Sequence, residues 1–139
     1  MELQEFAHER TRGLLGRVRK ELDRVTEKEA DADAIHDLRV SIRRLTQALR
    51  ALRGVIPNQE VKRIRRKLRS MMDLAAEIRN RDIAMELLEK SGVDATSSPV
   101  GRRLAEEREE AREDLVKLAK KWRKKGTMVQ QGWKGQMME

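Results

Sequence analysis

The apolar positions of the chain recur at alternating steps of three and four residues, which is the spacing of amphipathic helices. Four stretches follow this spacing, from about Leu3 to Thr26, Ala34 to Arg53, Gln59 to Lys90, and Ser98 to Lys125. β-branched and aromatic residues do not alternate with polar ones, so no strand is predicted. The pattern therefore predicts an all-α protein, folded as an antiparallel four-helix bundle.

The second and third stretches carry the longest apolar seams. In the second, the seam residues are Ile35, Leu38, Ile42, Leu45, Leu49, Leu52 and Ile56. In the third, they are Val61, Ile64, Leu68, Met71, Ala75, Ile78 and Met85. Asp82 falls on this third seam, where a carboxylate needs a partner. Because Arg79 and Arg81 are too close in sequence to share its face, we expect the partner on another helix. Arg81 and Asp82 are assigned to structural ion pairing, with catalysis by Asp82 as the less favoured alternative.

Turn and capping residues separate the four stretches. Asp31 or Asp33 is the expected N-cap of the second helix, and Gly54 with Pro57 is expected to end it. Ser98 followed by Pro99 is a typical helix start. Residues 1–125 are predicted to form one module, and residues 126–139 a tail that either frays or docks on a partner.

Positive charge is concentrated in one quarter of the chain. The 139 residues carry a formal net charge of +8. Residues 36–69 hold 11 Lys and Arg against two acids, a net of +9, and the other 105 residues hold 21 against 22, a net of −1. The fourth helix, by contrast, mixes both signs as a solvated face does. A positive field focused in this way favours an anionic partner.

On a helical wheel the basic residues of this segment form two stripes beside the seams. The first stripe is His36, Arg39, Arg43 and Arg50, with Arg44 lying apart, and the second is Lys62, Arg65, Arg66 and Arg69. A charge run is usually a solvated helix face, and that interpretation stays open. The scarcity of acids favours an anion site instead, because like charges three and four residues apart repel. If the two helices are antiparallel neighbours, both stripes line one groove.

Several other classes of function are disfavoured. The chain has no cysteine and two histidines, so a zinc site is not expected. We find no glycine-rich phosphate loop, no metal-binding carboxylate cluster and no nucleophile with a base, so a binding protein without cofactor or metal is expected rather than an enzyme. There is no secretory signal and no run of 18 apolar residues. A cytoplasmic protein that does not enter a membrane is therefore expected.

The segment "IHDLRVSIRRLTQALR" resembles the signature of the CHAD family, the conserved histidine α-helical domain. The family pattern reads roughly His-x-x-Arg-Val-x-x-Arg-Arg-Leu, and it is matched by His36, Arg39, Val40, Arg43, Arg44 and Leu45. Downstream, Arg81 and Asp82 match a family Arg-Asp pair. Ala84 stands where a second Asp is usual, and Met85 where Val is usual. The resemblance covers roughly residues 1–125.

The resemblance implies an all-helical domain that binds inorganic polyphosphate through basic residues. The residues implied as ligands are His36, Arg39, Arg43, Arg44, Arg50, Lys62, Arg65, Arg66 and Arg69. A usual CHAD domain has two four-helix halves, and this chain looks like the first. We therefore expect a homodimer in which a second copy takes the place of the second half. The apolar residues of the 126–139 tail, which would be covered in a dimer, support the same expectation.

Two alternatives remain. Charge alone does not distinguish phosphate polymers, so a nucleic-acid-binding protein is the second hypothesis. Residues 36–69 contain no aromatic residue, which disfavours base stacking but not contacts to a duplex backbone. A polyphosphate-processing enzyme is the third and weakest hypothesis. It requires carboxylates in the groove, and Asp73 near Arg69 is the only candidate.

Overall fold

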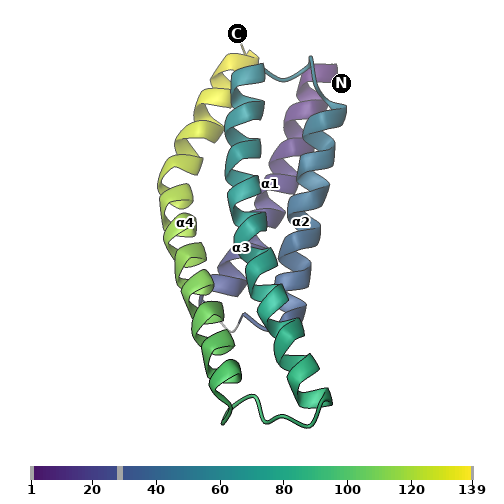
Figure 1. Ribbon diagram of the computed structural model, residues 1–139. Coiled ribbons are helices and arrows are strands. Elements are labelled where there is room, and N and C mark those ends of the chain that lie inside the picture. The colour runs from purple at the N-terminus through teal and green to yellow at the C-terminus, as the bar shows by residue number, and fades with distance from the viewer. Residues whose placement is uncertain (1, 28–29, 139) are drawn as a thin grey trace.

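Four helices make up the fold, and the computed structural model describes residues 2–27 and 30–138, with side chains as far as Trp122. The helices are α1 (Leu3–Glu27), α2 (Ala32–Ala51), α3 (Asn58–Lys90) and α4 (Pro99–Met138). Each runs antiparallel to the one before it (Figure 1). The described residues contain no strand. The predicted all-α antiparallel bundle is confirmed.

Side chains and glycines fix the helix ends much as predicted. Asp31 is the cap of α2, and its Oδ1 accepts a hydrogen bond from the Ala34 N–H at 2.8 Å. Gly54, with φ of 92°, makes the left-handed turn between α2 and α3 that other residues adopt only with strain. The Ser98 hydroxyl accepts from the Gly101 N–H at 3.0 Å at the start of α4.

The last helix is longer than the sequence predicts. It continues to Met138, where an end near Lys125 was expected. Side chains beyond Trp122 lie outside the described residues, so the predicted docking of the 126–139 tail on a partner stays a prediction.

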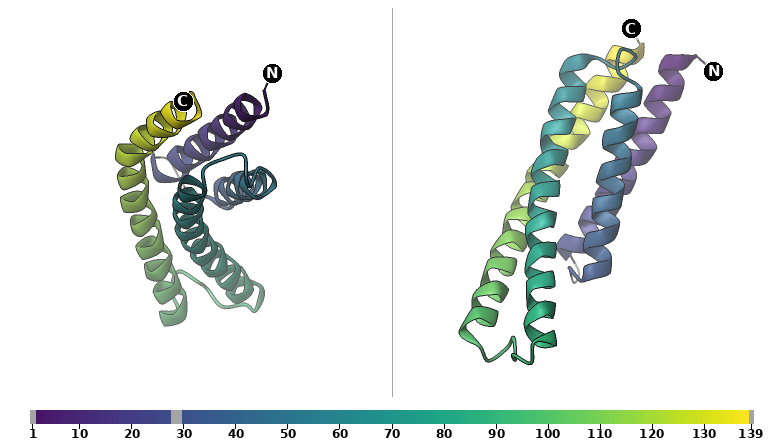
Figure 2. Two further views of the ribbon diagram at one scale, coloured as in Figure 1. Left: turned by 90° about the horizontal axis from the view of Figure 1, so that it is seen from above. Right: turned by 45° about the vertical axis from the view of Figure 1, so that its right-hand side comes forward.

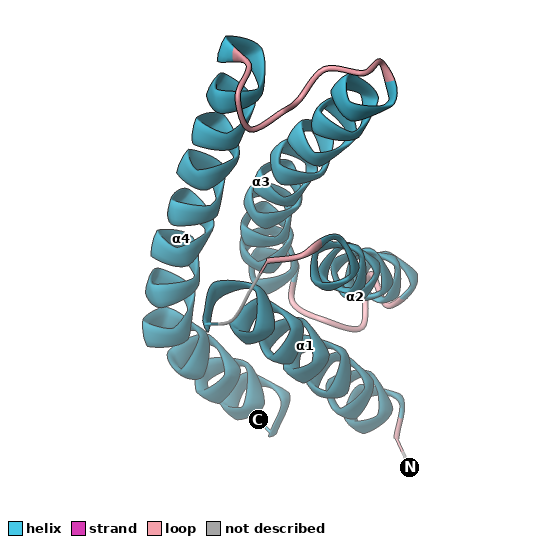
Figure 3. Ribbon diagram, turned by 90° about the horizontal axis from the view of Figure 1, so that it is seen from below, coloured by secondary structure: helices cyan, strands magenta, loops and turns pink. Residues whose placement is uncertain are grey.

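The predicted seams form the core. Seam residues from Ile35 to Leu49 on α2 and from Val61 to Ile78 on α3 are buried. They meet apolar residues of the other two helices, namely Leu15, Val18, Leu22 and Val25 of α1 and Ala111, Leu115, Ala119 and Trp122 of α4. Around this core α2 packs between α1 and α3, and α4 packs against α3 and α1 (Figure 3). The outer surface of α2 is therefore flanked by α1 on one side and by α3 on the other.

The α3–α4 hairpin extends past the connection between α1 and α2 (Figure 2). Burial of the α3 seam accordingly ends at Ile78, whereas Met85 is half-buried and Leu87 is exposed. In the part of the chain that the structure describes, no helix is long and apolar enough to cross a bilayer.

Candidate functional site

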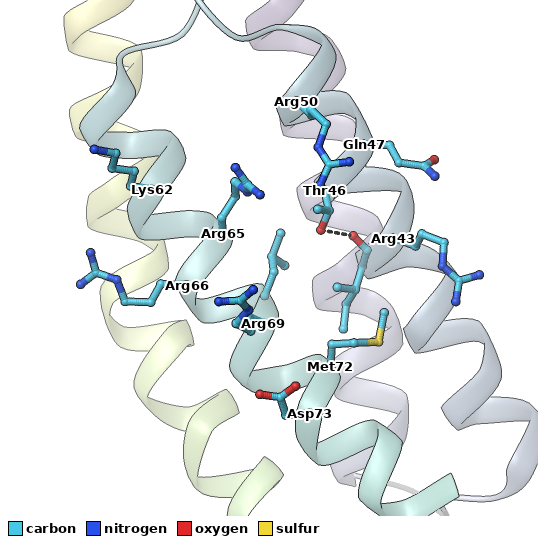
Figure 4. A pocket seen from close by; sticks show the side chains of 12 residues that line it. Arg43, Thr46, Gln47, Arg50, Lys62, Arg65, Arg66, Arg69, Met72 and Asp73 are labelled. Atoms are coloured by element: carbon cyan, nitrogen blue, oxygen red, sulfur yellow. Dashed lines mark hydrogen bonds between the residues drawn. The ribbon is translucent and has the colours of Figure 1, made fainter. Parts of the chain in front are cut away.

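A groove with a cavity volume of about 630 Å³ runs between α2 and α3. Six basic side chains line it, Arg43 and Arg50 from α2 and Lys62, Arg65, Arg66 and Arg69 from α3. Arg50, Arg65 and Arg69 lie over the space between the helices, with Lys62 and Arg66 on its far α3 edge and Arg43 on the α2 edge (Figure 4). The two predicted stripes thus meet along part of their lengths.

Helical spacing explains why these side chains share the groove. On each helix they follow the buried seam by one or two positions, so they emerge beside the core rather than over it. Ile42 and Leu68 of the two seams also line the groove. The Thr46 hydroxyl donates to the Ile42 carbonyl oxygen at 2.8 Å. That hydroxyl proton is thus used within α2, and the arginine and lysine nitrogens are the main donors to a bound molecule.

The six basic groups have no counter-charge of their own. All six are exposed, and none forms an ion pair with another described residue. Asp73, at one end of the groove, is the only acid among the described residues that line it. A row of like charges without acids raises the local potential and attracts an anion.

Several arginines outside the groove are paired with acids. The Arg24 Nη1 lies 2.7 Å from Asp37 Oδ2, and Arg103 Nε lies 3.1 Å from Glu107 Oε1. The first contact is a charge-assisted hydrogen bond from Arg24 to Asp37, and it raises the pKa of Arg24. Outside the groove some arginines are therefore paired and others, such as Arg12 and Arg102, are not, whereas none of the six groove bases has an ion pair with a described residue.

Arg39 belongs to the first stripe but lies beyond the groove, one helical turn before Arg43. Its Nε is buried and has no hydrogen-bond acceptor among the described residues. Burial lowers its pKa, and the nearby positive charges of Arg79 and Arg43 lower it further. Sequence reasoning did not propose Arg79, because that residue lies outside the basic segment 36–69.

His36 and Arg44 line a different hollow. It has a volume of about 330 Å³ and lies between α1 and α2, where Arg17 and Asp37 also contribute. Wheel analysis grouped His36 with the groove stripe, but the structure brings it beside α1 instead. The reason is that His36 stands at the edge of the stripe nearest Arg44, two turns before Arg43, where α1 rather than α3 is the neighbour.

Arg81 and Asp82 each pair with α4, not with each other. Arg108 Nε donates to Asp82 Oδ1 at 2.6 Å, and Arg81 Nη2 lies 3.0 Å from Glu107 Oε2. Arg108 also donates through Nη2 to the Ala30 carbonyl oxygen, in the connection between α1 and α2. These contacts join α3, α4 and the connection between α1 and α2, as expected of residues that stabilise the packing of the bundle.

Metal-binding potential is low in the part of the chain that is described. It holds no group of three or more His, Cys, Asp or Glu side chains that could bind a metal ion. Asp73 stands in the groove as a single carboxylate.

Comparison with known protein families gives one match. The profile of the CHAD domain matches residues 9–133, which is most of the chain. The comparisons with curated proteins and with solved structures gave no match.

Proposed function

The chain belongs to the CHAD domain family, and we propose that it binds inorganic polyphosphate in the groove between α2 and α3. Domains of this family bind polyphosphate in general. The observation that carries the proposal is the row of six exposed basic side chains without ion-pair partners in one groove. A polymer with a negative charge on every unit supplies the counter-charges for these six side chains.

Arginine is the better residue for this task. Its planar fork donates two parallel hydrogen bonds to phosphate oxygens, and it stays charged at any cellular pH. Five of the six groove bases are arginines. Along α3, Lys62, Arg65 or Arg66, and Arg69 follow one another at about one helical turn, or about 5 Å. A flexible polyphosphate chain can therefore meet successive donors from both walls of the groove.

The remaining predicted ligands fall into two groups. Arg39 adjoins the groove at its Arg43 end. His36 and Arg44 stand on the α1 side of α2, so a chain confined to the groove contacts neither of them. We propose the six groove residues as the main binding site.

Nucleic acid is the alternative ligand. Base recognition in single strands uses aromatic stacking, and no aromatic side chain lines the groove. Phe6 is half-exposed, but it lies with Arg10 and Arg44 in a hollow on the other side of α2. Contacts to a duplex phosphate backbone thus remain the form that this alternative takes.

A competition experiment distinguishes the two ligands. Labelled polyphosphate bound to the protein is displaced by unlabelled polyphosphate, duplex DNA or RNA at equal phosphate concentration and physiological salt. We expect polyphosphate to compete at least about tenfold better, because it carries more charge per unit length and no bulky sugar or base. Equal competition by duplex DNA would favour the nucleic-acid alternative instead.

We further propose binding without hydrolysis. Among the described groove residues Asp73 is a single carboxylate, whereas a two-metal site that stabilises both the attacking and the leaving oxygen needs several ligands. Incubation of the protein with polyphosphate and Mg²⁺ is expected to release no orthophosphate above background. Release that is lost in Asp73→Asn would identify a polyphosphate-processing enzyme.

The homodimer is retained as part of the proposal. Two copies would present two grooves to one polyanion, which raises the effective concentration of the second site. The tail residues that motivate it lie outside the described side chains.

A further inference from the structure

Beyond the Arg43 end of the groove, Arg39 and Arg79 lie on neighbouring helices, close enough for the charge of Arg79 to act on Arg39. Arg39 lies on α2 with its Nε buried and without an acceptor. Arg79 lies exposed on the neighbouring helix α3. Neither residue has an ion pair or a side-chain hydrogen bond with another described residue. Arg43, which lines the groove, is their link to it.

The uncompensated charge of Arg39 lowers the stability of the protein when no ligand is bound. Arg39 is half-buried, and a guanidinium whose Nε is shielded from solvent is normally paired with an acid or supplied with acceptors. Burial lowers the pKa of Arg39, and among the described residues the charges that act on it are the positive ones of Arg79 and Arg43, which lower it further. Arg108, which is also partly buried, pairs with Asp82 and with a backbone carbonyl. The chain can therefore neutralise a partly buried arginine, but it does not do so at Arg39.

We propose that Arg39, Arg43 and Arg79 form a second phosphate subsite that continues the groove, so that Arg79 selects long polyphosphates over short ones. This inference rests on the proposed function. It deepens that function by naming the class of chain that the site prefers. The missing counter-charge at Arg39 is then supplied by a phosphate group of the bound polymer.

Helix geometry gives the length dependence. From Lys62 to Arg69 the groove spans seven residues of α3, or about 10 Å, whereas Lys62 to Arg79 spans 17 residues, or about 25 Å. Tripolyphosphate can fill the groove without reaching Arg79. A long chain can occupy both parts, and its path runs along the Arg43 side because Asp73 repels phosphate on α3.

The test compares two ligands on three variants. Dissociation constants of tripolyphosphate and of a long-chain polyphosphate are measured for Arg79→Gln, for Arg65→Gln within the groove, and for Arg102→Gln. Arg102 is an exposed arginine of α4 without an ion pair, so it controls for net charge. Because Arg79 is exposed and unpaired, Arg79→Gln is expected to fold, which circular dichroism checks.

We expect Arg79→Gln to weaken long-chain binding by about tenfold, the value of one charge-assisted contact, and to leave tripolyphosphate binding unchanged within about twofold. Arg65→Gln should weaken both ligands, and Arg102→Gln neither. If Arg79→Gln affects both ligands equally, or neither, while Arg65→Gln weakens both, the subsite is wrong and the groove stands. If the wild type binds neither ligand, the proposed function fails and this inference with it.

Discussion

Removing two charges from the middle of the groove should lower both the affinity for polyphosphate and its dependence on salt. Arg65 and Arg69 lie over the space between α2 and α3 (Figure 4). Both are exposed and have no ion pair among the described residues. Glutamine keeps most of the length of the side chain and is a good helix former. The double variant Arg65→Gln/Arg69→Gln should therefore fold normally.

Counterion release sets the size of the effect. The six groove contacts alone contribute about −4 to the slope of log affinity against log salt on a single-stranded polyanion, which weakens binding by about 300-fold from 50 to 200 mM salt. With four contacts the slope is about −3 and the loss over the same range about 50-fold. At low salt, losing two charge-assisted contacts should reduce the affinity itself by about 100-fold.

The assay is a titration of labelled long-chain polyphosphate, followed by fluorescence anisotropy at four salt concentrations between about 50 and 200 mM, where binding is expected to be measurable. Arg12→Gln/Arg102→Gln is the matched control, because it removes the same net charge from exposed arginines outside the groove that have no ion pair with a described residue. The control should keep the wild-type slope and weaken binding by no more than about twofold, since distant charges are screened. If both double variants change slope and affinity equally, net charge rather than the groove binds the polymer, and our assignment is refuted.

Three further predictions concern single residues and assembly. Asp82→Ala should lower the free energy of unfolding by about 1–3 kcal/mol in a urea titration, because Arg108 would lose its carboxylate partner at a place where both side chains are 21% exposed. Unchanged stability together with lost polyphosphate binding would instead assign Asp82 to the binding site. Arg43→Gln should weaken polyphosphate binding more than Arg44→Gln does, because these sequence neighbours face different helices; the reverse order would move the site to the α1 side of α2. Sedimentation over a concentration series, with and without polyphosphate, should detect a homodimer that polyphosphate strengthens, and a mass near 16 kDa under every condition would exclude it.

The fold could be predicted almost completely, because its determinants are local. The step of three and four residues fixes which face of each helix is buried, and the seam from Ile35 to Leu49 is buried as expected. Short connections make successive helices antiparallel. The end of α4 was predicted too early because glycine commonly follows the last residue of a helix, and Gly126 was interpreted in this way. The helix instead continues through Gly126 to Met138. A glycine weakens a helix by about 1 kcal/mol and does not by itself stop it.

The site could be predicted only in part, because a helical wheel gives directions but not neighbours. It correctly brought Arg43 and Arg50 together with the α3 stripe, and it could not tell that α1 rather than α3 lies next to His36. Arg108 was missed as the partner of Asp82 because it lies in the mixed-charge part of α4, which was interpreted as solvated. Its role depends on which α4 residue lies opposite Asp82, and that is set by how α3 packs against α4, because the two residues are 26 positions apart in sequence.

The groove charges that favour a polyanion also act on the stability of the free protein, and salt should move the two effects in opposite directions. Without ligand, Arg65 and Arg69 repel their basic neighbours, and Arg39 is repelled by Arg79 and Arg43. Added salt screens this repulsion and so stabilises the free fold. The same salt weakens the complex, because the release of counterions then gains less free energy. At low salt polyphosphate should therefore raise the melting temperature most, because a ligand at free concentration L stabilises the fold by RT ln(1 + L/Kd) and Kd is smallest there. A fold whose acids pair with arginines outside the groove, and leave those inside it bare, exchanges some stability of the free state for a binding energy that only a polyanion can supply.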